Sequence, residues 1–351
     1  MGKKIRVLIV DDSAVVRQIL SQGLSADPEI EVVGTASDPY IARDKILQCK
    51  PDVLTLDVEM PRMDGVEFLR RLMPQHPMPV LMVSSLTERG KQITVQALEA
   101  GAVDFVTKPT SDVQRGLNQM LGELRQKLKI AATANVSRWK RRNYQPRRPT
   151  PAASHALAES TDKVIAIGAS TGGTEAVRQV LGELPGDTPG IVVVQHMPAG
   201  FTRMFAQRLN EHSAMVVKEA KTGDRILQGR VLIAPGDYHM KVYRSGGMYY
   251  VECKQADKVC GHRPSVEVLF RSVAYSVGAN AIGIILTGMG HDGADGMVAM
   301  RKAGAKTIAQ DEATCVVFGM PKVAYEKGGT DQLVALDRIP GKLLSMLSVK
   351  G

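Results

Sequence analysis

Three carboxylates and a lysine stand at the ends of apolar segments in the first third of the chain. Asp11 and Asp12 follow the segment VLIV, and Asp57 follows VLTL. Lys108 ends a third segment, FVTKP, where Pro109 stops the strand. Carboxylates that lie close together repel one another unless a cation joins them, and hard carboxylate oxygens with a backbone carbonyl suit Mg²⁺. The pattern predicts a divalent-cation site able to receive a phosphoryl group.

A hydroxyl group completes this set. Ser84 follows the apolar segment VLMV and is expected at the end of a fourth strand. Any one of these acids could instead be a helix N-cap or a solvated surface charge. An acidic pair, a lone aspartate, a hydroxyl and a Lys-Pro pair at four strand ends favour a common site.

A serine in a glycine-rich turn is the second feature with chemical potential. Ser170 lies in GASTGG, directly after the apolar segment VIAIG. Such a strand-to-helix turn exposes the side-chain oxygen and directs helix N-terminal amides toward it. A glycine-rich turn could also hold a dinucleotide pyrophosphate, although GASTGG departs from G-x-G-x-x-G and no acidic residue ends the next strand.

A histidine ends that next strand, in IVVVQHMP. His196 would then lie at the strand tip beside Ser170, which needs a base because its hydroxyl is a poor nucleophile at neutral pH. A lone histidine after a strand is also often a capping or packing residue. His239 and His291 are rival candidates for the base.

An acid follows the strand AIGIILTG, in the segment MGHDG. Asp292 can hold the His196 imidazole in the required tautomer. It can also be read as the N-cap of a helix over residues 294–302. The order Ser, His, Asp differs from that of the α/β-hydrolases, where the acid precedes the histidine, so the expectation rests on strand ends meeting in space.

The elements that must position the first set form a repeated pattern. From Lys3 to about Leu128, short β-branched segments alternate with stretches of helical period, which predicts an α/β domain with a parallel sheet. The five expected strands are Ile5–Val10, Glu31–Ala36, Asp52–Leu56, Pro79–Val83 and Val103–Val106. Because parallel strands end at one edge of a sheet, the acids, Ser84 and Lys108 should meet there.

The same alternation resumes after Asp162. The apolar segments are KVIAIG, IVVVQ, RVLIAP, AIGIILTG and AKTIAQ, which predict a second, doubly wound parallel-sheet α/β domain. Residues 243–244 and 248–252, around Ser245-Gly246-Gly247, predict an inserted β-hairpin. The edge argument again brings Ser170, His196 and Asp292 together.

Basic residues are concentrated in one segment. The net charge is +9, and nine Lys or Arg with no Asp or Glu lie between Leu124 and Ala158. Residues 129–161 are basic and rich in Pro and Ala without apolar periodicity, which predicts a linker between domains at 1–128 and 162–351. The linker is either a solvated connector or a docking segment for an acidic partner surface.

The basic segment also raises DNA binding as an alternative output. That function needs a helix-turn-helix or a comparable reading element, and the second domain shows strand-helix alternation instead. We therefore expect no nucleic-acid partner. A domain that binds its target without chemistry is a further alternative, against which the intact Ser170, His196 and Asp292 argue.

Composition limits the remaining classes. The longest apolar stretches are far shorter than the roughly 20 residues of a membrane helix, and the N-terminal residues lack a signal-peptide pattern. Four cysteines are scattered, and Cys260 with nearby His262 lacks the second ligand pair of a zinc site. We expect a cytoplasmic protein with reduced thiols and no membrane insertion.

The first 125 or so residues resemble the response-regulator receiver family, through VLIVDD, LDVEMPRMDG, MVSS and DFVTKP. The resemblance implies a flavodoxin-like fold and phosphoryl transfer from a partner kinase's phosphohistidine to Asp57. It implies Mg²⁺ held by Asp12, Asp57 and the main-chain carbonyl of Glu59, with Asp11 contributing through water. The implied switch residues are Ser84, Phe105 and Lys108.

Residues 163–349 resemble the catalytic domain of the chemotaxis protein-glutamate methylesterases. The matching stretches are IGASTGG, VVQHMPAGFTRMFAQRLN, LIAPGDYHM, HRPSVEVLF and LTGMGHDGADG. The resemblance implies Ser170 as nucleophile, His196 as general base and acid, Asp292 as its orienting partner and the Met289 amide as oxyanion donor. One departure is His291, where relatives often carry asparagine; it puts the local pH response in doubt.

The resemblance also implies what the chain acts on. The substrate class is a methylated glutamate of a methyl-accepting chemoreceptor, hydrolysed with release of methanol, and certain receptor glutamines would be deamidated. The phosphodonor would be a chemotaxis histidine kinase, and the esterase domain would need no cofactor. Arg203 and Arg208 either meet an acidic receptor helix or form a solvated face. We expect a monomer in which the unphosphorylated receiver covers the catalytic edge.

Overall fold

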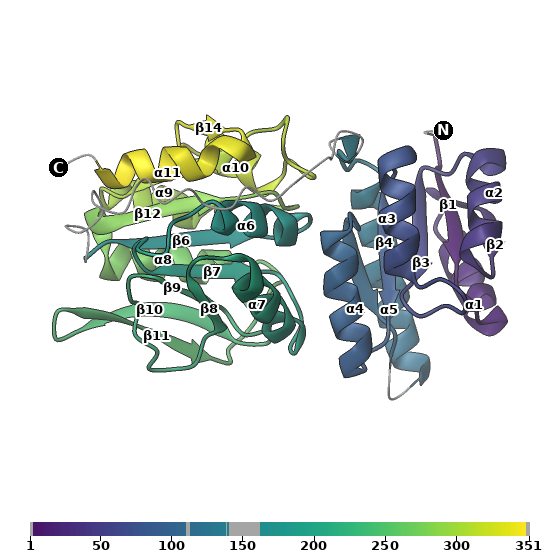
Figure 1. Ribbon diagram of the computed structural model, residues 1–351, viewed down its shortest axis with the longest axis horizontal. Coiled ribbons are helices and arrows are strands. Elements are labelled where there is room, and N and C mark those ends of the chain that lie inside the picture. The colour runs from purple at the N-terminus through teal and green to yellow at the C-terminus, as the bar shows by residue number, and fades with distance from the viewer. Residues whose placement is uncertain (1–2, 110–112, 138, 140–161, 349–351) are drawn as a thin grey trace. The chain divides into compact units, whose positions relative to one another are not determined.

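The computed structural model describes residues 3–109, 113–137, 139 and 162–348. The chain divides into two compact units, residues 1–144 and 145–351. Each unit contains its own parallel sheet (Figure 1). The predicted α/β class is therefore confirmed for both parts of the chain.

The first unit is built on five parallel strands in the order β2-β1-β3-β4-β5. This is the flavodoxin-like order, in which the direction of strand addition across the sheet reverses between β1 and β3. The strands lie within one or two residues of the predicted ones: β1 (Ile5–Val10), β2 (Ile30–Ala36), β3 (Val53–Asp57), β4 (Val80–Ser84) and β5 (Asp104–Thr107).

Helices connect these strands, and α1 packs beside α5 while α3 packs beside α4. Their bounds are α1 (Ala14–Ser25), α2 (Pro39–Cys49), α3 (Gly65–Gln75), α4 (Glu88–Glu99) and α5 (Val113–Ala131). Four of them begin at side chains that accept a hydrogen bond from the first turn, namely Ser13, Asp38, Asp64 and Thr87. Caps of this kind satisfy amides that have no partner inside the helix.

The first unit continues past the boundary expected at residue 128. Helix α5 ends at Ala131, and Trp139 is buried, with 8% of its surface exposed. The Trp139 ring lies against Gly101, where an added Cβ would be 3.1 Å from Cε2. Part of the segment expected as linker thus belongs to this unit, and residues 140–161 of that segment lie outside the described residues.

The second unit is built on seven parallel strands in the order β14-β13-β12-β6-β7-β9-β8. The five predicted strands appear as β6 (Val164–Ala169), β7 (Ile191–Gln195), β9 (Arg230–Ile233), β12 (Ala281–Ile285) and β13 (Lys306–Gln310). The sequence did not predict the two edge strands, β8 (Val216–Glu219) and β14 (Leu333–Val334). Strand β14 has two residues, and β8 (VVKE) has only two apolar residues, so neither shows an apolar period.

Two groups of helices pack on this sheet, α6 with α7 and α11, and α8 with α9 and α10, as expected for a doubly wound domain. Their bounds are α6 (Gly173–Gly182), α7 (Phe201–His212), α8 (Val266–Ser276), α9 (Ala294–Lys302), α10 (Met320–Glu326) and α11 (Ile339–Ser348). The core contains Val192, Leu232, Phe270 and Ile285.

The predicted hairpin is present and longer than expected. Strands β10 (His239–Ser245) and β11 (Met248–Lys254) pair antiparallel, and α8 packs against β10. The turn residues Gly246 and Gly247 have φ of 56° and 81°. A two-residue hairpin turn with both residues at positive φ favours glycine. Across the described ranges, no helix is long and apolar enough to cross a bilayer.

Candidate functional sites

The first site lies at the carboxyl edge of the five-stranded sheet, where the strand order reverses. Asp11 and Asp12 follow β1, and Asp57 ends the neighbouring β3. Their carboxylate oxygens lie within 4.8 Å of one another. Sequence reasoning placed these three residues at one edge, and the structure brings them together.

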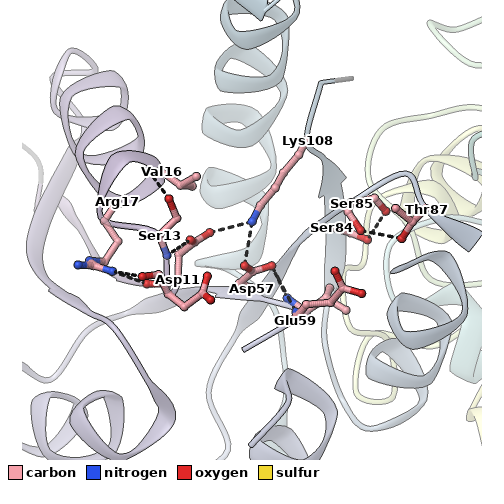
Figure 2. Close-up of polar contacts among 12 residues, drawn as sticks. Asp11, Ser13, Val16, Arg17, Asp57, Glu59, Ser84, Ser85, Thr87 and Lys108 are labelled. Carbon is pink, nitrogen blue, oxygen red and sulfur yellow. Dashed lines mark hydrogen bonds and ion pairs between the residues drawn. The ribbon is translucent and has the colours of Figure 1, made fainter. Parts of the chain in front are cut away.

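Lys108 stands between the acids, as Figure 2 shows. Its Nζ donates to Asp57 Oδ2 at 2.8 Å and to Asp11 Oδ2 at 3.0 Å. Burial alone would lower the Lys108 pKa, but attraction to Asp57 and Asp11 outweighs it and raises the pKa above its ordinary value. The lysine therefore stays charged beside the acids.

The position of Asp57 in the fold changes its protonation. Burial raises the Asp57 pKa from 3.8 to about 6. The negative charge of Asp11 also raises this pKa, whereas the positive charge of Lys108 lowers it. The N–H of Val58 donates to Asp57 Oδ1 at 2.7 Å, which fixes the carboxylate plane. The Glu59 backbone lies beside it, with its N–H 3.5 Å from the same oxygen.

The donor chemistry of this cluster suits a hard divalent cation. Two buried carboxylates and one exposed one converge, and oxygen ligands are what Mg²⁺ prefers. The Glu59 side chain points toward Arg89, at 3.9 Å, so Glu59 would contribute through its backbone. The residues present fit the expected ion.

The other two residues expected to act as a switch contact residues other than Asp57. The Ser84 hydroxyl is 2.5 Å from Thr94 Oγ1 on α4, and Figure 2 shows it separated from the acids. Phe105 is buried, and Lys127 Nζ lies 5.3 Å from its ring centroid. Lys127 also donates to the Phe105 carbonyl at 2.6 Å.

The second site lies at the carboxyl edge of the seven-stranded sheet, again where the strand order reverses. Ser170 follows β6, His196 follows β7 and Asp292 comes after β12. The register brings the three strand ends together, because the His196 N–H donates to Ala169 O at 3.1 Å and the Ser170 N–H donates to Thr287 O at 3.0 Å.

The three side chains form a continuous hydrogen-bonded chain. His196 Nδ1 lies 3.0 Å from Ser170 Oγ, and His196 Nε2 lies 2.7 Å from Asp292 Oδ2. With Nε2–H donating to the carboxylate, Nδ1 is free to accept the serine proton. The ring nitrogens thus have the opposite assignment to that of the chymotrypsin triad.

Close backbone approach shapes the turn that carries Ser170. Gly172 has φ of 75° and caps α6, and a Cβ there would lie 2.5 Å from the Val316 side chain. A Cβ at Gly288 would lie 2.7 Å from Ser170 Cβ. Gln195 Nε2 donates to the Ser170 carbonyl at 2.9 Å. Glycine is therefore required both within the nucleophile turn, at Gly172, and on the segment that faces it, at Gly288.

Asp292 does not cap α9, whose N-cap is Gly293 and which has no side-chain cap bond. Its carboxylate lies at the N-terminus of α8, where it accepts from Ser265 Oγ at 2.8 Å and from the N–H groups of Val266 and Glu267 at 2.8 and 2.9 Å. Burial raises the Asp292 pKa, but the His196, Glu267 and Ser265 interactions outweigh it and hold the pKa below its ordinary value. The N-cap alternative from the sequence is therefore wrong for α9.

Met289 lies beside this chain, and 49% of its surface is exposed. Among the described residues its N–H has no acceptor. The Ser170 N–H, by contrast, is already bonded to Thr287 O. A free amide near a serine turn is what an oxyanion donor requires.

The rival histidines lie elsewhere. His239 is buried, with Nε2 2.9 Å from Asp257 O and Nδ1 accepting from the Ser265 N–H at 3.2 Å. His291 is exposed. Among the described residues, Asp11, Asp12 and Asp57 form a group whose ligand atoms lie close enough to hold a metal ion together.

Sequence reasoning missed several residues that support the triad. Ser265 anchors Asp292, and Thr287 Oγ1 donates to the Thr171 carbonyl at 3.0 Å. His262 was considered only as a metal ligand, yet its ring stacks on His196. A serine directly before an apolar helical period was the available signal for Ser265.

Comparison with known proteins places both units. A family model described as CheB methylesterase matches residues 165–343, and one described as response regulator receiver domain matches residues 7–132. A protein-glutamate methylesterase/protein-glutamine glutaminase of Syntrophotalea carbinolica is 67% identical over 349 residues, which are 99% of each chain. Its counterpart from Sulfurimonas denitrificans is 56% identical over 352 residues, covering 98% of this chain and 99% of that one.

A solved structure agrees with these matches. The crystal structure of the Thermotoga maritima CheB methylesterase catalytic domain is 40% identical, with a TM-score of 0.52. The match covers 53% of this chain and 99% of that one. The chain therefore belongs to the CheB methylesterase family, with a response-regulator receiver domain preceding its methylesterase domain.

Proposed function

We propose that this chain is a phosphorylation-controlled protein-glutamate methylesterase with Ser170 as nucleophile. The observation that carries the proposal is the hydrogen-bonded chain from Ser170 through His196 to Asp292. The family names of its relatives supply the ester, a methylated glutamate side chain. A serine, a histidine and a carboxylate joined in this order are suited to acyl transfer.

The reaction takes two steps. Ser170 Oγ attacks the ester carbonyl while its proton passes to His196 Nδ1; the imidazolium then protonates the departing methoxide, which leaves as methanol. In the second step His196 removes a proton from water as the water oxygen attacks the acyl-serine carbonyl. The imidazolium then returns that proton to Ser170 Oγ as the C–O bond to serine breaks, and the glutamic acid product ionises to the carboxylate. Asp292 stabilises the imidazolium in both steps.

The negative oxygen of each tetrahedral intermediate needs a donor. The Met289 amide is our candidate, because it has no acceptor among the described residues. A preorganised donor of this type contributes about 3 to 4 kcal/mol to the transition state. The same acyl chemistry accepts a glutamine side chain, with ammonia leaving in place of methanol.

The receiver supplies the control. We propose that Asp57 accepts a phosphoryl group from the phosphohistidine of a chemotaxis kinase. Mg²⁺, which neutralises phosphoryl charge when bound, would be held by Asp12, Asp57 and the Glu59 carbonyl, with Asp11 contributing through water. Lys108, which now bonds Asp57, would instead bond the phosphoryl oxygens. The Ser84 hydroxyl would leave Thr94 and also bond the phosphoryl group, and Phe105 would change its packing.

The partners follow from these two activities. The phosphodonor is a histidine kinase, and the substrate is a methyl-accepting chemoreceptor. We therefore propose that the protein acts in the cytoplasm, and we propose separately that it is a monomer. Arg203 is exposed on α7, and Arg208 on the same helix pairs with Glu211 at 2.6 Å. Both arginines are candidates for contact with an acidic receptor helix.

Methanol release from methylated receptor membranes tests the proposal. Wild-type protein should release methanol faster when a small phosphodonor and Mg²⁺ are added, and Asp57→Ala should show only the basal rate. Ser170→Ala should release none in either condition. Equal release by wild type and Ser170→Ala would overturn the hydrolase assignment and leave a domain that only binds its target.

A further inference from the structure

A second imidazole lies flat on the proposed catalytic base. The rings of His196 and His262 are stacked, with centroids 3.7 Å apart and planes 11° from parallel. The mechanism above gives His262 no role. Two imidazoles in face-to-face contact at a reacting centre call for an explanation beyond simple packing.

The chain holds His262 by a tight turn. The N–H of His262 donates to Val259 O at 2.9 Å, and the N–H of Val259 donates to His262 O at 3.1 Å. The two residues between them, Cys260 and Gly261, have φ of 51° and 80°. This reciprocal pair with two left-handed residues is the geometry of a two-residue hairpin turn.

Both flanks of the turn are fastened to the start of β10 and the residues just before it. On one side Arg263 Nε donates to Asp237 Oδ1 at 2.9 Å. On the other side His239 Nε2 donates to Asp257 O at 2.9 Å. The turn is therefore braced at two points, and the His262 ring is presented in a fixed orientation.

The same stretch also fixes Asp292. Ser265 Oγ and the amides of Val266 and Glu267 all donate to its carboxylate. Residues 259–267 thus support the base in two ways. His262 packs against the ring face of His196, and the start of α8 holds Asp292, which accepts the His196 Nε2–H. A single segment sets the orientation of two triad members.

We propose that His262 is a positioning residue for the esterase reaction, which holds the His196 ring in the plane that joins Ser170 Oγ to Asp292. This inference rests on the proposed function. Hydrogen bonds at Nδ1 and Nε2 fix the ring at its two nitrogen atoms but allow it to rock about the axis that joins them. A parallel ring against one face prevents that rocking and presents a π face to the imidazolium that forms when Ser170 gives up its proton.

Direct proton transfer between the two histidines does not fit this arrangement. Imidazole donors and acceptors lie in the ring plane, and the two planes are parallel, 11° apart. His262 therefore acts through the face of His196 and does not relay its proton.

Four substitutions in the full-length chain separate positioning from other roles. His262→Ala removes the ring, His262→Leu keeps bulk without a flat face, and His262→Phe restores a flat ring. His212→Ala, at the far end of α7, is the control for losing a histidine. We would measure kcat and KM for methanol release from methylated receptor membranes, together with the melting temperature of each variant.

We expect kcat to fall about tenfold to a hundredfold in the Ala and Leu variants with KM nearly unchanged, because small misplacements of a catalytic group cost this much. The Phe variant should recover most of the loss, and His212→Ala should match wild type. If the Ala variant fails to fold, the comparison of Leu with Phe decides the question.

Three results would overturn the proposal: wild-type kcat in the Ala or Leu variant, a Phe variant as slow as the Leu variant, or a change confined to KM. Ser170→Ala is measured alongside. Methanol release by Ser170→Ala at the wild-type rate would reject the proposed function itself, which is a different failure from wild-type activity in the His262 variants alone.

Discussion

The ionised Asp57 carboxylate destabilises the folded protein. The folded protein raises its pKa to about 6 from an ordinary value of 3.8 through burial and the nearby Asp11, despite Lys108. The folded state therefore binds the Asp57 proton more tightly than the unfolded chain does. Stability from this group is greatest at low pH and declines as the pH rises from about 4 through about 6.

Replacing Asp57 with Asn should remove that destabilisation. Without Mg²⁺, we expect the free energy of unfolding of the first unit to rise by up to about 3 kcal/mol at pH 8, and by much less at pH 5. Urea denaturation at several pH values measures the difference. Asp44→Asn, at an exposed ion pair with Arg43, is the control, and an equal effect of Asp57→Asn at both pH values would contradict the expectation.

The Asp292 carboxylate accepts hydrogen bonds from four donors. An asparagine side chain cannot replace it in all four, because only its oxygen accepts and its NH₂ group donates. In Asp292→Asn, the NH₂ group would face a donor, either His196 or the start of α8. We expect kcat for methanol release to fall by about 10² to 10⁴, as for loss of a triad acid elsewhere. Asp295→Asn, an exposed acid on α9 paired with Lys327, should keep wild-type kcat; a similar loss in both variants would argue against a specific role for Asp292.

At the scale of elements, the start of α8 serves the fold and the proposed chemistry together. Ser265 caps the helix by accepting from the Val268 N–H at 3.4 Å, and its hydroxyl donates to Asp292 at 2.8 Å. One side chain thus caps the start of a helix and orients the triad acid. Loss of this hydroxyl should affect stability and turnover in the same variant.

Ser265→Ala should lower the free energy of unfolding of the second unit by about 1 kcal/mol and reduce kcat several-fold. Asp64→Ala, which removes the cap of α3 in the other unit, should cost similar stability without changing basal esterase activity. Urea denaturation and methanol release measured on the same preparations provide the comparison. A Ser265 variant with normal kcat would show that the Asp292 orientation does not depend on the hydroxyl.

The sequence predicted elements well where a strand is long, apolar and central. Strands β1, β3, β6 and β12 have this character, and the acids and Ser170 follow directly from their ends. The edge strands β8 and β14 were missed because β14 has two residues and only two of the four residues of β8 are apolar. Short edge strands are defined by their neighbours and leave little periodic signal.

The supporting contacts could not be predicted for a different reason. Ser265 lies 27 residues before Asp292 along the chain, and Thr287 contacts Thr171 across 116 residues. Such pairs depend on the packing of helices on the sheet, which local patterns do not encode. The stacking of His262 on His196 likewise depends on a turn braced by Asp237.

At the scale of the whole molecule, phosphorylation can control esterase activity only if the receiver domain acts on the esterase domain to which the linker joins it. A linked module has a high effective concentration at its target, so even weak covering inhibits. We propose that the unphosphorylated receiver covers the catalytic edge and that phosphorylation of Asp57 releases it.

Deletion of residues 1 to about 145 should raise the basal rate of methanol release, on the order of tenfold. The isolated domain should remain folded, since the match to the Thermotoga maritima catalytic domain covers 99% of that chain. Rates of the truncated and the unphosphorylated full-length proteins are compared at equal concentration. A truncated protein that is no faster would contradict inhibition by the receiver.

The position of Trp139 gives the chain a built-in optical probe. It is the only tryptophan in the sequence, and its ring is buried against Gly101 in the first unit. Tryptophan emission should therefore follow the melting of the receiver alone, whereas circular dichroism follows both sheets. Comparing the two signals during one denaturation assigns each transition to its domain without any label.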